Sequence, residues 1–187
     1  MSLHAAGLRA ASVLAAGALA AAIAAPASAD RSATPPDRSG WDDLVWEPYR
    51  TQSFTSPAGQ LCAFTLQADP VADEEMVATV ARFADGSPKV EAYKGRLVVR
   101  YTNVETGAAT DKDLSGSAVV RYFEDGAYTM YMYGPVGLGF RETDRYPRGM
   151  YVLDGFHVVH TGADPADRDR EMVVDGGSEH AICGDLD

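Results

Sequence analysis

The stretch SAVVRYFEDGAYTMYMY, residues 117–133, decides the fold class of this chain. Two runs rich in β-branched and aromatic residues flank the dipeptide Asp125-Gly126. An Asp-Gly pair between two such runs is the strongest short-range signal for a β-hairpin. With these two residues as the whole loop, we expect Phe123 to pair with Tyr128.

Both faces of this expected hairpin are apolar or aromatic. In the expected register, Tyr122, Tyr131 and Tyr133 share one face. A face in contact with water would carry polar side chains, so either both faces are covered or one face lines a cavity. Tyrosine combines an apolar body with a polar tip, which suits a ligand-lined interior. These three tyrosines are therefore the candidate ligand-binding residues; the alternative is that they fill a core.

The chain from residue 51 onward repeats this pattern of short alternating runs broken by turns. The other runs are residues 61–68, 75–83, 96–103, 136–141, 149–160 and 170–177. In one of them, Leu97, Val99 and Tyr101 point to the same face. Outside the first 29 residues, only residues 71–83 offer a helical period as an alternative. The pattern predicts an all-β, mostly antiparallel fold of about eight strands, either an up-and-down barrel or a sandwich.

The run GMYVLDGFHVVH, residues 149–160, contains a second Asp-Gly pair, for which we expect a second hairpin with Asp154 and Gly155 at its tip. His157 and His160 are three residues apart on one strand, so their side chains point to opposite faces. The two histidines therefore cannot share one metal ion or one active site.

No segment carries a catalytic or cofactor-binding motif. DKDLSG, residues 111–116, begins like a calcium loop, but Tyr122 occupies the position of the bidentate acid. Gly137 and Gly139 lack the spacing of a phosphate loop; glycines inside a strand indicate a bend or a close approach of two backbones. We therefore predict no metal site, no cofactor and no catalytic residue.

The first 29 residues predict a Sec-type signal peptide. A short basic start precedes an alanine-rich apolar run, and a small-residue site ends at Ala29, after which we expect cleavage. Residues 30–50 form a Pro-rich leader, in which residues 41–45 are either a helical turn that caps the domain or a loop. Residues 51–187 form a single β-domain. The localisation predicted from these segments is extracellular.

The chain has two cysteines, Cys62 and Cys183, and a formal net charge of −11. Because exported proteins meet an oxidising environment, we expect a Cys62–Cys183 disulfide; the alternative is two free thiols. An acidic chain without a basic cluster is not expected to bind nucleic acid. No segment after the signal peptide is long and apolar enough to predict a membrane span.

Four short stretches resemble a group of small secreted actinobacterial proteins of unknown function. They are CAFTL, TNVETG, DLSG and ICGDL, which match an early cysteine-containing strand, two turns and a terminal cysteine of that group. The resemblance implies a β-barrel-like secreted domain with a Cys62–Cys183 bridge, and it supplies no catalytic residues.

The expected function is that of a secreted, non-catalytic binding module for a small molecule, a glycan or a protein. One alternative is a secreted hydrolase or isomerase, which requires His157, His160 or His180 beside a carboxylate in a pocket. Another is a structural or interaction protein of the cell envelope. The sequence predicts neither the identity of the ligand nor the oligomeric state.

Overall fold

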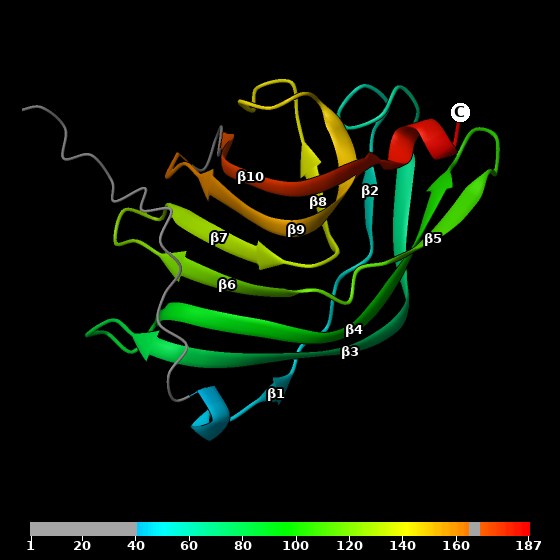
Figure 1. The fold of residues 1–187 in the computed structure, drawn as a ribbon. Helices are drawn as coiled ribbons and strands as arrows, with labels where there is room; N and C mark the ends of the chain where they lie inside the picture. Colours follow the sequence, from blue (N-terminus) through cyan, green and yellow to red (C-terminus); the bar gives the residue numbers. More distant parts are fainter. Residues whose placement is uncertain (1–40, 165–168) are drawn as a thin grey trace, which may run out of the picture.

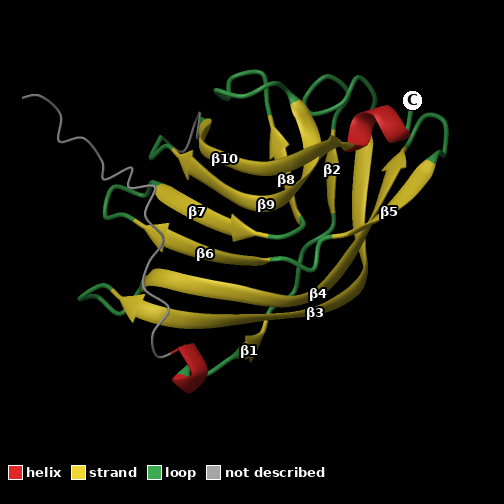
Figure 2. Ribbon diagram, viewed as in Figure 1, coloured by secondary structure: helices red, strands yellow, loops and turns green. Residues whose placement is uncertain are grey.

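The computed structural model describes residues 41–164 and 169–187, which form an antiparallel β-structure with two short 3-10 helices (Figures 1 and 2). The predicted signal peptide, residues 1–29, and residues 30–40 of the predicted leader lie outside the described residues. The elements are η1 (Trp41–Asp43), β1 (Glu47–Pro48), β2 (Phe54–Ser56), β3 (Leu66–Arg82), β4 (Pro88–Asn103), β5 (Ala109–Asp113), β6 (Ser117–Tyr122), β7 (Tyr128–Tyr133), β8 (Val136–Phe140), β9 (Gly149–Thr161), β10 (Arg170–Ala181) and η2 (Ile182–Asp185).

All ten strands belong to one sheet, with the order β1-β3-β4-β6-β7-β9-β10. The three remaining strands attach at the sides, as β2 pairs with β3, β5 with β4, and β8 with β9. The long strands bend and change partners along their length, so that β3 and β4 turn upward beside β2 and β5 in Figure 1. Within the described chain, the end strands β1 and β10 do not pair with each other, so the sheet is not closed. The all-β, antiparallel prediction is confirmed, with more strands than expected.

The hairpin in residues 117–133 is confirmed, but its expected register is wrong by one residue. Tyr122 pairs with Tyr128, and Phe123 and Ala127 close a loop of three residues rather than two. Gly126 occupies the left-handed region at φ 91°. Three-residue hairpin loops end on such a residue, and the extra loop residue shifts every pair by one position.

Residues 149–160 form no hairpin, which corrects the second expected turn. They lie within β9, which continues without interruption through Asp154 and Gly155 and pairs with β10 on both sides of these residues. Gly155 lies opposite Gly177, and a Cβ atom on Gly155 would stand 2.7 Å from the Cα atom of Gly177. The glycines therefore allow two backbones to approach closely at a bend of the sheet.

The predicted strand at residues 75–83 belongs to β3, which also contains the end of residues 61–68. The helical alternative for residues 71–83 is therefore wrong. Leu97, Val99 and Tyr101 are all buried in the core, as their shared face predicts. The helical turn considered at residue 41 is present as η1, where Trp41 packs against a core cluster around Tyr131.

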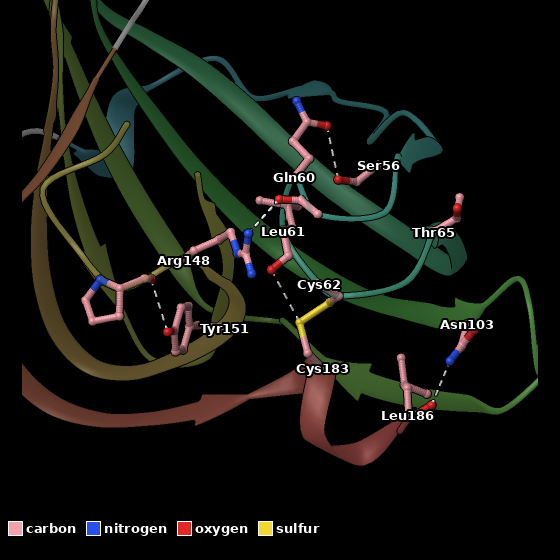
Figure 3. The surroundings of a disulfide bond; sticks show 12 residues. Ser56, Gln60, Leu61, Cys62, Thr65, Asn103, Arg148, Tyr151, Cys183 and Leu186 are labelled. Carbon is pink, nitrogen blue, oxygen red and sulfur yellow. Dashed lines mark hydrogen bonds between the residues drawn. A yellow bond between two sulfur atoms is a disulfide. The ribbon is translucent and has the colours of Figure 1, made fainter. Parts of the chain in front are cut away.

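The predicted disulfide between Cys62 and Cys183 is confirmed (Figure 3). It joins the segment before β3 to η2 near the end of the chain, with a Cα–Cα distance of 5.5 Å. Nearby, the Asn103 side chain donates a hydrogen bond to the Leu186 carbonyl at 3.0 Å. Arg148 donates to the Gly59 carbonyl at 2.9 Å. None of the described helices is long and apolar enough to span a membrane.

Candidate functional site

Two adjoining cavities lie between the layers formed by the bent sheet, and β8 lines both of them. The first, called here the apolar hollow, has a volume of about 230 Å³ and lies between β3, β4 and β8. The second, the arginine hollow, has a volume of about 470 Å³ and lies between β2, β8 and the ends of β9 and β10. Phe54, Gly137 and Met150 line both hollows, so the two hollows adjoin at these residues.

The glycines of β8 leave room for side chains of neighbouring segments to pack against this strand. A Cβ atom on Gly137 would stand 2.8 Å from Cδ1 of Leu114 and 3.0 Å from the Tyr101 hydroxyl. A Cβ atom on Gly139 would stand 3.0 Å from the Leu61 side chain. The atoms that approach Gly137 and Gly139 closely therefore belong to side chains and not to a second backbone, which corrects the backbone approach expected from the sequence.

The apolar hollow has hydrocarbon walls and one polar end. Its apolar lining residues are Phe54, Ala68, Pro70, Leu97, Val99, Leu114, Ala118, Val136 and Met150. At the polar end, the Thr51 hydroxyl donates a hydrogen bond to the Glu75 carboxylate. Burial raises the pKa of Glu75, and the neighbouring Asp73 carboxylate raises it further. The hydroxyl of Tyr93, which also lines this hollow, donates to Glu91 at 2.7 Å.

The arginine hollow is organised around one buried carboxylate outside its lining. The Asp144 side chain is fully buried and accepts hydrogen bonds from the backbone N–H groups of Arg141 at 2.6 Å and Arg170 at 2.8 Å. Both arginine side chains line the hollow. The Arg170 Nη1 group donates to the Gly139 carbonyl. A single acid therefore fixes the backbone at the base of both arginines.

Two buried donors beside this hollow have no hydrogen-bond partner in the protein. They are the Nε atom of Arg170 and the hydroxyl of Thr161, a residue only 1% exposed. Thr161 lies opposite Tyr128 in the sheet, and both residues line the hollow. Leaving one buried polar group unpaired costs about 1–3 kcal/mol, so two around one cavity indicate a place for a polar ligand group.

The structure does not bring the three predicted tyrosines together. Because of the register shift, Tyr122 faces away from the side that carries Tyr131 and Tyr133. The Tyr122 hydroxyl donates to Glu91 at 2.9 Å, and burial raises the pKa of Tyr122 to about 12. Tyr131 is buried in a core cluster, and the ring of Tyr133 lies 4.9 Å from that of Phe156. None of the three predicted tyrosines lines either hollow.

Sequence reasoning missed the residues that do line the arginine hollow. Arg141, Thr161 and Arg170 belong to three segments that are distant in sequence and meet only in the folded sheet. Arg170 lies among alternating acids and arginines, a pattern typical of a solvated loop. Tyr128 had a local signal, since it lies in the aromatic hairpin, but the expected register gave it no role.

His157, His160 and His180, the histidines of the described residues, lie outside both hollows. The Nδ1 atom of the buried His157 is 3.3 Å from an Asp175 oxygen, and the Nε2 atom of His180 is 2.7 Å from an Asp185 oxygen. His160 contacts the Thr129 hydroxyl at 3.0 Å. As expected, His157 and His160 face opposite sides of β9. Acid–histidine pairs of the kind that the enzyme alternative requires are therefore present, but they lie outside the two cavities in which a substrate could bind.

Within residues 41–164 and 169–187, no three potential metal-ligating side chains cluster together. Asp111, at the start of the calcium-like stretch, instead binds the Arg100 guanidinium through two hydrogen bonds of 2.7 and 2.8 Å. Comparisons with protein-family models, curated proteins and solved structures find no match to this chain. What the site can hold therefore follows from the chemistry of its own lining.

Proposed function

We propose that the protein is a secreted, non-catalytic binding module for a small, largely apolar molecule held in the two hollows. The observation that carries this proposal is that the two hollows adjoin and share Phe54, Gly137 and Met150 in their linings. The larger hollow alone falls within the range of about 300–1,000 Å³ typical of ligand pockets. Apolar walls with a few polar groups at the ends are the usual lining of such pockets.

The lining favours a small molecule over the glycan or protein that the sequence left open. A glycan carries hydroxyl groups along its whole length, and each loses a hydrogen bond to water when it enters a cavity. Leu97, Val99, Leu114 and Met150 offer these hydroxyls no partner. A protein partner would contact a convex or flat surface rather than the inside of a bent sheet. A compact apolar molecule makes favourable contacts along the whole apolar hollow.

The extracellular location is part of the proposal and is supported by the Cys62–Cys183 bond. Structural disulfides persist in oxidising compartments and are rare where glutathione keeps thiols reduced. The predicted signal peptide points to the same location. The proposal of a non-catalytic role is supported by the positions of the acid–histidine pairs, which lie away from both hollows.

Binding of a neutral apolar fluorophore such as 1-aminoanthracene tests this function. Wild-type protein is expected to raise the fluorescence of the probe in a saturable manner. In the variant Gly137→Val, the added side chain would collide with Leu114 where the two hollows adjoin, and we expect the affinity for the fluorophore to be at least tenfold weaker. Gly184→Ala is the matched control, because a Cβ atom there meets no atom within 4 Å. Absence of saturable binding to the wild type would refute the proposal.

A further inference from the structure

The structure contains a built site for one charged group, and we propose that the arginine hollow binds the carboxylate of an amphipathic monocarboxylate whose apolar tail lies in the apolar hollow. This inference rests on the proposed function and specifies its ligand. It depends on four residues that meet at one end of the cavity pair. They are Tyr128, Arg141, Thr161 and Arg170.

The first step is that the two arginines are fixed before any ligand arrives. Asp144 accepts a hydrogen bond from the backbone N–H of each, and its Oδ1 atom lies 3.8 Å from the Arg141 guanidinium. The Arg170 Nη1 group is held by the Gly139 carbonyl. Guanidinium groups positioned in this way bind carboxylates through strong, charge-assisted hydrogen bonds.

The second step is that donors remain for the ligand. The Arg170 Nε–H group and the Thr161 hydroxyl are buried and have no protein partner, although both belong to residues that line the hollow. Thr161 is 1% exposed and lies opposite Tyr128, which also lines the hollow. A carboxylate has two oxygens and accepts several hydrogen bonds, so it can satisfy both unpaired donors at once.

The third step is the charge of the site. Within the described chain, Arg141 and Arg170 are the only charged residues that line the arginine hollow, although the whole protein has a formal net charge of −11. The two cationic side chains favour an anionic head group in an otherwise acidic protein. The two unpaired donors, Arg170 Nε–H and the Thr161 hydroxyl, match the two oxygens of a carboxylate better than the three oxygens of a phosphate monoester.

The fourth step gives the orientation of the ligand. The far end of the apolar hollow holds Glu75, with Asp73 close enough to perturb its ionisation. An anionic head group would be repelled there and attracted to the arginines. The two hollows adjoin at Phe54, Gly137 and Met150, and from there the tail lies against Leu97 and the other apolar walls.

Calorimetric titration with three probes of equal chain length tests this inference at neutral pH. The probes are decanoate, decan-1-ol and decylamine, whose heads are anionic, neutral and cationic. We expect decanoate to bind at least tenfold more tightly than decanol, and decylamine to bind more weakly than decanol. Decyl phosphate, used as a doubly charged probe, is expected to bind less tightly than decanoate.

Two variants assign the preference to the site. Arg170→Gln is expected to weaken decanoate binding at least tenfold and to leave decanol within about twofold. Thr161→Val keeps the shape and removes a hydroxyl that has no protein partner, so it should fold and still weaken decanoate binding about threefold or more. Arg145→Gln is the matched control, because this exposed arginine pairs with Asp169 and Glu171 outside the hollow.

The outcomes separate this inference from the function on which it rests. Equal affinities for decanoate and decanol, or tighter binding of decylamine or decyl phosphate, would overturn the carboxylate site and leave the binding function standing. If none of the probes binds and the neutral fluorophore also fails, the proposed function is wrong. If Arg170→Gln does not fold, unchanged decanoate affinity in Thr161→Val overturns the inference.

Discussion

Replacing Cys62 and Cys183 with alanine removes the bond between two residues 121 positions apart. In the chain-entropy model, a cross-link over so long a loop lowers the entropy of the unfolded chain enough to stabilise the fold by about 5 kcal/mol at 25 °C. For a domain of roughly 150 residues, each kcal/mol shifts the melting temperature by about 2–4 °C. The expected fall in melting temperature is therefore about 10–20 °C.

The loss should also reach the candidate site, because Gln60 and Leu61 line the arginine hollow directly before Cys62 (Figure 3). Without the bond, this segment is no longer held to η2, so we expect decanoate to bind more weakly even at temperatures where the variant remains folded. Affinity would be measured at least 10 °C below the melting temperature of the variant.

Differential scanning calorimetry on three samples checks the magnitude. These are the oxidised wild type, the wild type in a reducing buffer and the double alanine variant. The reduced wild type is the control for packing, since Cys62 is buried and its sulfur remains in place. Both altered samples should melt well below the oxidised protein. A fall of less than about 3 °C in the reduced wild type would refute the reasoning from loop closure.

Three further predictions concern single residues. Gly155→Ala should lower the free energy of unfolding, measured in urea, by at least about 2 kcal/mol, because Gly155 has a φ of +111° and no room for a Cβ atom. The control Gly184→Ala should change the free energy of unfolding by less than about 0.5 kcal/mol, and equal effects of the two variants would contradict the bend in β9. Burial raises the pKa of Glu75 in the folded protein, so the wild type loses stability as the pH rises above the pKa that Glu75 has in the unfolded chain. The stability of Glu75→Gln relative to wild type should therefore increase from pH 4 to pH 7, and a difference that does not depend on pH would count against this reasoning. Hydrogen bonds from His180 and Lys112 lower the pKa of Asp185, so Asp185→Asn should be less stable than the wild type at pH 7. This difference in stability should vanish as acid protonates the wild-type carboxyl, and a difference that persists at pH 2 would argue against the ionic contact.

The class of fold followed from local sequence because period-two alternation is a local property of the chain. Leu97, Val99 and Tyr101 show this clearly, since all three are buried. Register was harder to predict, because loops of two and three residues around Gly126 differ little in sequence but shift every pair by one position.

The role of Asp154-Gly155 could not be inferred from its own surroundings. The same dipeptide type forms a tight turn at residue 126 and a continuous strand at residue 155. The difference lies in the partner strand, because β10 places Gly176 and Gly177 beside Gly155 and so allows the two paired backbones to approach closely. That partner is more than twenty positions further along the chain, beyond the range of local patterns.

The candidate site depends even more on distant segments. Arg141 and Arg170 are brought together by Asp144 and by the pairing of β9 with β10, and no spacing in the sequence marks them. The disulfide was predictable, because two cysteines in a chain with a predicted signal peptide leave one possible pairing. The aromatic hairpin suggested Tyr122, Tyr131 and Tyr133 as ligand-binding residues, but Tyr122 contacts Glu91 and the other two pack in or against the core.

The arginine hollow takes its walls from both ends of the described chain, with Ser56 and Leu61 on one side and Arg170 on the other. Arg170 begins β10, so the chain has no such cavity until this strand has paired. Pairing between strands so far apart in sequence is slow compared with local folding. On the proposed function, a chain exported unfolded through the predicted signal peptide collects its ligand outside the cell, once β10 has paired.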